Sequence, residues 1–450
     1  MSKRAADEMA APTQQLIKRS KSEKLTQNLI DLHDDYLESI FKWLNLKDLL
    51  TIVRVSKRFE ELVGSIISRQ YAKDLLKITL YEYDTMDKDP DVLVLREMSS
   101  ILPFLRCFGS STSKLMVRFD EKNPKQCLAI EDYVLKFCNE LKELTLDYCR
   151  KGAFDRIEKP FQQVEILSFT GGHLGHNISK FNKWFPKLRS LTISHASVAN
   201  KYCIEETMPS LEHMSVKIGS ASKVFSKQNI DGSVRSNPQL RSYNLNNGCK
   251  PRDLRFVNCE LKQLEKLEFW IHPQNFEKGC IQPIIFKEVK ELTLDIYDKG
   301  FMVMNDLFER DSSKKHRLVC PKLEQLEVRC YHLYEKYFDF ARGNNLKKLT
   351  MFSQYDGPSI EFLTEYASHW PNLTEVTIQV DSLSADDIVE FIESCRHLQR
   401  LNISDERKDI VPKIEELKAK LPQEWKVVSM ITKCYCYDFE HSIIRQASAP

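Results

Sequence analysis

The stretch Leu141-Lys142-Glu143-Leu144-Thr145-Leu146 carries the pattern that decides the fold. Its three leucines are separated by two residues and then by one, and the same spacing of apolar residues returns along most of the chain. Further copies begin at Val164, Leu188, Leu211, Leu240, Leu264, Val289, Leu323, Leu346, Leu373, Leu398 and Trp425. Because side chains two residues apart point to the same face of a β-strand, each copy predicts a short strand with one buried face.

The copies recur about every 26 residues, inside the range of roughly 20–29 residues that is typical of leucine-rich repeats. Apolar residues at helical spacing, such as Ile388, Phe391 and Ile392, stand between the strands. Residues 73–431 therefore resemble a leucine-rich-repeat solenoid of the α/β class. We expect a horseshoe with a parallel sheet on its concave face and helices outside, opened by weaker copies near Leu75 and Val117.

The segment before the repeats, residues 25–72, has a different pattern. An apolar stripe at the spacing of one helix face runs through Leu37, Ile40, Phe41 and Leu44. Two more short helices are predicted, one around Leu49 and one starting near Ser56, with Asp34 and Ser56 as N-caps. Three short helices cannot bury all of their apolar side chains alone, so we expect part of this surface to bind a partner.

Residues 32–59 resemble an F-box in the order of their landmarks. The family pattern runs Leu-Pro, a helix ending in Ile-Phe and a leucine, then Asp-Leu, then Val-Cys-Lys and a tryptophan. The matching landmarks are Ile40-Phe41, Leu44, Asp48-Leu49 and Val55. His33 stands in place of proline, Ser56 in place of cysteine and Phe59 in place of tryptophan. The change at His33 matters most, because proline pre-sets the backbone at the start of a helix.

The resemblance implies a non-catalytic substrate receptor of a Skp–cullin–F-box ubiquitin ligase. The three helices would bind a Skp-type adaptor and, through it, a cullin-RING ligase, while the solenoid captures an unknown target protein for ubiquitination and degradation. The residues expected to contact the adaptor are Leu32, His33, Leu37, Ile40, Phe41, Leu44, Leu49 and Val53. Such a receptor acts by proximity, so no cofactor, metal or catalytic residue is expected in this chain.

The residues that alternate with the buried strand positions are expected to face the concave side of the solenoid. Their charges are mixed along the array, which favours a protein partner over a phosphate backbone. Trp270, Arg329 and Phe352 stand out among them, because aromatic side chains near an arginine are typical of binding hot spots. We expect these three residues to anchor the target, unless helices or the C-terminal tail cover the aromatic side chains.

Both ends of the chain are predicted to be tails. Residues 1–24 are polar and are expected to be disordered. Their basic clusters, Lys3-Arg4 and Lys18-Arg19-Ser20-Lys21, resemble a bipartite nuclear localisation signal that an import receptor reads, although an ordinary solvated basic tail has the same composition. Residues 432–450 form the second tail, which either caps the solenoid or lines its concave face. We expect a nuclear location, a cytoplasmic one, or both.

Composition argues against several other functions. The chain has 450 residues, with 66 Lys and Arg against 64 Asp and Glu, and this near balance argues against nucleic acid as the main partner. It shows neither a signal peptide nor an apolar stretch of about 18 residues, so we expect no secretion and no membrane span. Its 13 scattered cysteines contain no Cys-x-x-Cys pair, which predicts buried free thiols instead of disulfides or zinc ligands.

Two further functions stay open on the sequence alone. One is a nuclear leucine-rich-repeat scaffold that never joins a ubiquitin ligase, which His33 and the basic tail suggest. The other is a small-molecule sensor whose ligand fills the concave face. The concave positions show no basic cluster suited to an anionic ligand, so the sensor ranks lowest.

Overall fold

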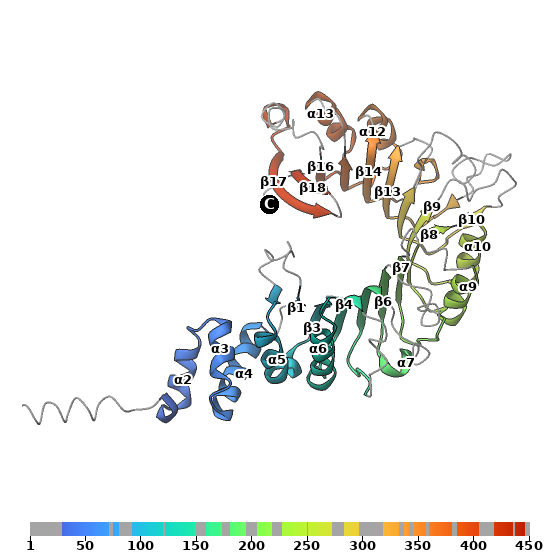
Figure 1. The fold of residues 1–450 in the computed structure, drawn as a ribbon. Helices are drawn as coiled ribbons and strands as arrows, with labels where there is room; N and C mark the ends of the chain where they lie inside the picture. The colour runs from blue at the N-terminus through green and yellow to red at the C-terminus, as the bar shows by residue number, and fades with distance from the viewer. Residues whose placement is uncertain are drawn as a thin grey trace, which may run out of the picture. The chain divides into compact units, whose positions relative to one another are not determined.

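A computed structural model gives the fold of the chain (Figure 1). It describes residues 29–71, 75–80, 92–119, 122–149, 159–172, 181–194, 205–217, 227–249, 251–271, 283–296, 318–332, 337–341, 345–356, 360–379, 385–404, 418–434 and 437–445. The chain divides into two compact units, and the boundary between them falls between Lys142 and Glu143. The predicted N-terminal tail, with the basic residues Lys3, Arg4, Lys18, Arg19 and Lys21, lies outside the described residues.

The first unit begins with a short 3-10 turn, η1 (Leu29–Asp31), and three helices. The helices are α2 (Asp34–Phe41), α3 (Leu46–Ile52) and α4 (Lys57–Tyr71). Ser56 caps α4 as predicted, since its Oγ accepts a hydrogen bond from the backbone N of Phe59 at 3.2 Å. The prediction for α2 was wrong by one residue, because its N-cap is His33 and the His33 side chain makes no capping hydrogen bond.

The three helices share a small core of their own. The rings of Phe41 on α2 and Phe59 on α4 meet edge to face, with centroids 5.3 Å apart. Leu37, Leu49 and Val53 are fully buried in the same segment. Each buried side chain of this size stabilises the fold by about 1.5–3 kcal/mol, which is what lets three short helices form one domain.

The remainder of the first unit starts the strand pattern. Strands β1 (Leu75–Thr79), β2 (Val92–Leu95) and β3 (Lys114–Arg118) are parallel in the order β2-β1-β3. The elements that accompany them are α5 (Met98–Phe108), η2 (Gly109–Ser111) and α6 (Pro124–Phe137). Cys107 on α5 donates a hydrogen bond from Sγ to Glu60 on α4 at 3.1 Å. The compact unit therefore continues past residue 72, the boundary expected from the sequence, as far as Lys142.

The second unit is a long sheet of parallel strands. In spatial order they are β4 (Glu143–Cys149), β5 (Ile166–Gly172), β6 (Ser190–Ser194), β7 (His213–Lys217), β8 (Ser242–Cys249), β9 (Lys266–Ile271), β11 (Glu291–Ile296), β13 (Gln325–His332), β14 (Lys348–Asp356), β15 (Glu375–Gln379) and β16 (Arg400–Ser404). The connecting segments contain α7 (Phe181–Trp184), α9 (Lys227–Ser236), α10 (Pro251–Glu260), η7 (Asp339–Ala341), α12 (Ile360–Ala367) and α13 (Ala385–Ser394). A separate pair of two-residue strands joins β10 (Ile284–Ile285) to β12 (Leu318–Val319). Figure 1 shows the labelled helices of this unit on one side of the strands.

The apolar positions of the repeat pair in register from strand to strand. Leu144 pairs with Leu167, Leu167 with Leu191, and Leu191 with Met214. The same row continues through Tyr243, Leu267, Leu292, Leu326, Leu349, Val376 and Leu401, all of them buried. The side chains between these positions point to the other face of the sheet, which we call the open face. The predicted parallel sheet of a leucine-rich-repeat solenoid is confirmed.

The C-terminal end of the sheet differs from the prediction. The Trp425 copy was expected to extend the parallel array, but β17 (Trp425–Cys434) does not pair with β16. Strand β18 (Tyr437–Arg445) lies between them and runs antiparallel to both. Only two residues separate β17 from β18, and a parallel crossover needs about a dozen or more. Residues 437–445 of the predicted C-terminal tail therefore form a strand of the sheet.

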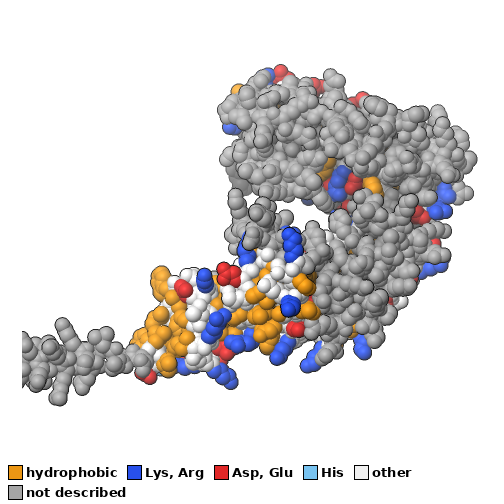
Figure 2. Space-filling model, in the orientation of Figure 1, with side chains coloured by type: hydrophobic (Ala, Val, Ile, Leu, Met, Phe, Trp, Pro, Cys, Tyr) orange, Lys and Arg blue, Asp and Glu red, His pale blue; other side chains and the backbone are white. Residues whose placement is uncertain are grey.

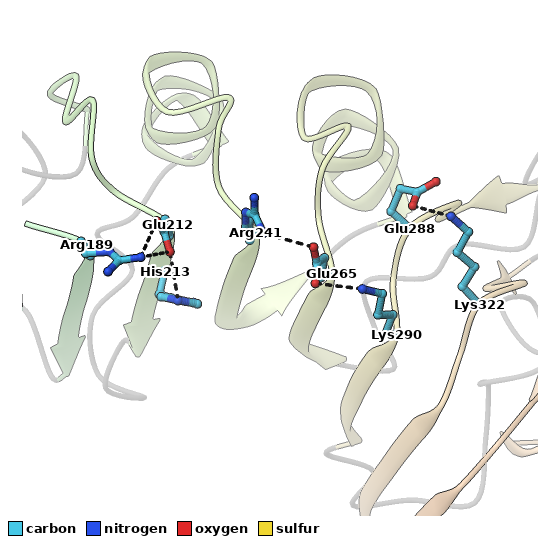
Figure 3. A network of polar contacts seen from close by, with 8 residues as sticks. All are labelled: Arg189, Glu212, His213, Arg241, Glu265, Glu288, Lys290 and Lys322. Carbon is cyan, nitrogen blue, oxygen red and sulfur yellow. Dashed lines mark hydrogen bonds and ion pairs between the residues drawn. The ribbon is translucent and has the colours of Figure 1, made fainter.

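In the long sheet, the residues just before strands β5 to β9, β11, β13 and β14 form a row of alternating charge, the charge ladder. Its members are Glu165, Arg189, Glu212, Arg241, Glu265, Lys290, Glu324 and Lys347. Figure 3 shows several of the side-chain pairs, including Arg189 with Glu212 at 2.9 Å and Lys290 with Glu265 at 3.1 Å. The backbones of the same residues are also bonded, since Glu212 N donates to Arg189 O at 2.8 Å. The ladder thus places opposite charges on neighbouring repeats.

Candidate binding surfaces

The structure divides the predicted adaptor-contact residues into a buried and a surface set. Leu37, Phe41, Leu49 and Val53 are buried in the core of the three helices and present no surface to a partner. Ile40 and His33 are exposed, and Leu32 and Leu44 are half-buried. The four buried residues are thus corrected from adaptor contacts to core residues. They were misassigned because a stripe that faces the domain's own interior looks the same in sequence as one that faces a partner.

A second apolar stripe lies on the surface of α2 and of the turn that follows it. Tyr36, Ile40 and Trp43 follow the helical spacing of i, i+4 and i+7, one residue out of step with the buried stripe. Trp43 is 90% exposed, which is unusual for so large a side chain. Leu29, Ile30 and Val55 are exposed on the same domain, and Figure 2 shows hydrophobic side chains gathered over these helices. Of these residues, only Ile40 was predicted to contact the adaptor, although the second stripe could have been found by testing each helical phase.

The lead-in segment, residues 29–33, is held to α4 by Arg58. The Arg58 guanidinium donates hydrogen bonds to the backbone O atoms of Ile30 and Leu32, both at 2.6 Å, and to Asp34 Oδ1 at 2.7 Å. His33 has a φ of −63° and a ψ of 151°, and this φ is the value that a proline ring enforces. His33 therefore takes the backbone conformation of the missing proline, with Arg58 supplying the constraint from another helix.

The three residues predicted to anchor a target lie in one row across the open face. Asp295 on β11 pairs in register with Trp270 on β9 and with Arg329 on β13, and Arg329 pairs with Phe352 on β14. The structure thus brings the predicted residues together. It places Asp295 between Trp270 and Arg329, a residue that was expected on this face but not predicted as an anchor. Phe352 is only 6% exposed and Trp270 is half-buried. The row therefore offers a target less aromatic surface than the sequence suggested.

Arg329 is the centre of a group of charges that we call the central cluster: Glu268, Asp295, Glu327 and Arg329. Its Nε donates to Glu327 Oε1 at 2.7 Å, and its Nη1 reaches Glu268 Oε1 at 3.4 Å across strand β11. Burial raises the pKa of Asp295 above its ordinary value. The nearby charges of Glu268 and Glu327 raise it further, while those of Arg329 and Lys217 lower it. Arg329 is thus already engaged by carboxylates of its own chain.

The N-terminal helices match a known protein family. The family model described as the F-box domain matches residues 29–71. This segment is an F-box domain. No curated protein matches the chain. The conclusion therefore rests on the family match together with the three helices and their shared core.

Solved structures with a similar fold include leucine-rich-repeat proteins. The crystal structure of the Rad7 and Elc1 complex in yeast has a TM-score of 0.40 and 12% identity, covering 92% of this chain and 97% of that chain. The leucine-rich repeat-containing protein LegL7 from Legionella pneumophila has a TM-score of 0.39 and 13% identity, covering 72% of this chain and 97% of that chain. Because these scores are low, the description of the solenoid rests on its own strands and register.

Three buried cysteines of the described residues have thiols with raised pKa values. Burial raises the pKa of Cys138 and Cys320 to about 12 and that of Cys395 to about 11, so these thiols are poor sources of nucleophilic thiolate at neutral pH. Within the described ranges, no group of three or more His, Cys, Asp or Glu side chains is placed to hold a metal ion. Nor does any helix in those ranges have the length and apolar character to cross a membrane.

Proposed function

We propose that this chain is a substrate receptor of a Skp–cullin–F-box ubiquitin ligase. The observation that carries the proposal is the exposed second stripe, with Tyr36 and Ile40 on α2 and Trp43 in the turn after it, on the surface of an F-box domain. A stripe of large apolar side chains is costly to leave in water, which is why such surfaces usually bind another protein. The stripe binds a Skp-type adaptor, and the adaptor connects the chain to a cullin-RING ligase.

The solenoid supplies the second half of the function, which is capture of a target protein. The open face carries mixed charges and the half-buried Trp270, a composition suited to a protein surface. The chain itself then needs no catalytic group, because holding a target lysine close to the ubiquitin-carrying enzyme raises its effective concentration. The predicted nuclear import through the basic tail stays a prediction of the sequence, as does a shared nuclear and cytoplasmic location.

The alternative of a scaffold outside any ligase rested on the histidine in place of proline and on the basic tail, which lies outside the described residues. His33 adopts a proline-like φ and Arg58 holds the residues around it, so the substitution does not prevent the helix from starting in the usual way. The adaptor surface that follows it is exposed. The ligase receptor is therefore the function that the geometry supports better.

Adaptor binding tests this proposal with a matched pair of variants. Ile40→Asp places a charge in the exposed stripe, and Ile285→Asp places the same charge on a residue of similar exposure in the solenoid, 43% against 40%. Wild type and Ile285→Asp should co-purify with a Skp-type adaptor, while Ile40→Asp and Trp43→Ala should weaken binding by about 30-fold or more, the scale of a hot-spot residue. A wild-type chain that does not bind the adaptor refutes the function. Normal binding by folded Ile40→Asp and Trp43→Ala refutes the surface.

A further inference from the structure

The central cluster on the open face has an excess of negative charge. Three carboxylates, those of Glu268, Asp295 and Glu327, come from the adjacent strands β9, β11 and β13. Within the described ranges, Arg329 bonds two of them, Glu268 and Glu327. Lys217 acts on Asp295 from β7. The other charges of the open face near the cluster neutralise one another, since Lys266 pairs with Glu291 at 2.8 Å and Lys348 pairs with Glu375 at 3.1 Å.

Asn244 provides an independent sign that a hydrogen-bond donor is missing beside the cluster. It lies on β8 in register with Glu268, so its side chain is on the open face next to that carboxylate. Asn244 is only 7% exposed, and among the described residues its Oδ1 has no hydrogen-bond partner. Buried amide oxygens are normally paired. A ligand that brings N–H donors would satisfy Asn244 and the carboxylates together.

The chemistry of the surrounding residues selects an organic cation. The described carboxylates do not gather closely enough to hold a metal ion, and a phosphate would be repelled by them. Lysine and arginine side chains carry only donors and a positive charge. Trp270, which neighbours Asp295 in register, is the aromatic residue whose ring attracts such cations best.

We propose that the central cluster binds a lysine or arginine side chain from a basic segment of the target protein, between Asp295, Glu268 and Asn244. That the basic segment belongs to a ubiquitination target rests on the function proposed above. Binding of the segment itself does not require the adaptor. Arg329 takes part as an internal counter-ion that holds Glu268 and Glu327 in place, in contrast to the anchor role that the sequence suggested for it. Specificity for basic segments follows from the excess of carboxylates, three against the cations of Arg329 and Lys217.

The test measures binding of a fluorescent arginine-rich peptide to the full chain, without adaptor. The matched probe is the same peptide with citrulline at each arginine, which keeps the size and several donors but removes the charge. The arginine peptide should bind, and the citrulline peptide should bind about tenfold more weakly or worse. Equal affinity for the two peptides, or no binding of either, overturns the proposal.

Variants locate the site on the open face. Asp295→Asn and Glu268→Gln keep the shape of the side chains and should each weaken binding of the arginine peptide by about tenfold, while Glu375→Gln, outside the cluster, should change it less than twofold. Because burial raises the pKa of Asp295, Asp295→Asn should not lower the thermal midpoint of unfolding. Unchanged peptide affinity in Asp295→Asn together with a lower midpoint would show a structural role only and refute the site.

The same variants separate this inference from the proposed function. Asp295→Asn should bind a Skp-type adaptor as wild type does, because the F-box is untouched. If the wild-type chain binds the arginine peptide in the expected way but no adaptor, the ligase function fails and the cation site stands. If it binds the adaptor and shows no preference for arginine over citrulline, the cation site fails and the ligase function stands.

Discussion

Replacing Arg58 by methionine tests whether a guanidinium from α4 does the work that proline does at the start of an F-box. Methionine keeps much of the apolar stem and removes the three hydrogen bonds to Ile30 O, Leu32 O and Asp34. The Arg58 side chain is 39% exposed, so each bond is worth about 0.5–1 kcal/mol, less than a buried charged bond. In Arg58→Met, the free energy needed to open the lead-in segment should fall by about 2 kcal/mol. This corresponds to a factor of about 30 in the equilibrium constant for opening.

Hydrogen exchange of the backbone amides measures this opening directly. The amides of Tyr36 and Leu37 donate to the His33 carbonyl O, and in Arg58→Met their protection should fall by up to about 30-fold. The control is Arg54→Met, which removes a hydrogen bond to Ser99 O far from the lead-in segment and should leave those amides protected. Adding His33→Pro to Arg58→Met should restore part of the protection, because the φ of His33 already suits proline.

Two outcomes would show that this reasoning is wrong. Unchanged protection of Tyr36 and Leu37 in Arg58→Met would mean that the three hydrogen bonds do not hold the segment. An equal loss in Arg54→Met would mean that the effect is a general loosening of the domain. The adaptor affinity of Arg58→Met should fall by no more than the measured loss of protection, since only the ordering of the segment has changed.

Two further predictions concern the solenoid. Burial raises the pKa of Glu206, whose carboxylate accepts hydrogen bonds from the backbone N atoms of Phe181 and Asn182 at 2.7 and 3.1 Å. A carboxyl whose pKa is raised on folding stabilises the folded state most below its ordinary pKa of 4.5, and this contribution is lost as the pH rises. In denaturant titrations, the stability of Glu206→Gln relative to wild type should therefore increase as the pH rises from 4.5, and a constant difference would contradict this. In the charge ladder, Arg189→Glu and Glu212→Arg should each lower the thermal midpoint, and the double variant should recover part of the loss; no recovery would mean that the pair at 2.9 Å does not contribute.

Much of the fold is predictable because it depends on short-range regularities. The three apolar positions of each repeat must face the same interior, so their spacing alone predicts strands such as β9 and β11 and their mutual register. The stripe of Leu37 and Phe41 likewise predicts α2. The strand order at the C-terminus was missed because β18 inserts beside β16, a pairing that no repeat spacing indicates.

The binding surfaces were harder to predict, for two physical reasons. On α2 the buried and exposed stripes differ by one residue in phase, and both are apolar, so the sequence does not tell which one faces the core. On the open face, Asp295 lies between Trp270 and Arg329 only after three strands align, and the chain separates neighbouring members of this row by 25 and 34 residues. The bonds from Arg58 to Ile30 and Leu32 span a similar distance along the chain.

The alternation along the charge ladder sets a rule for how this solenoid can change in length. Deleting one repeat, for example the one that carries Glu212, would bring Arg189 beside Arg241 and leave two guanidinium groups facing each other. Deleting two consecutive repeats restores the order of signs at the new junction. Growth and shrinkage of the array are therefore tolerated best in steps of two, and the natural building block of this chain is a pair of repeats.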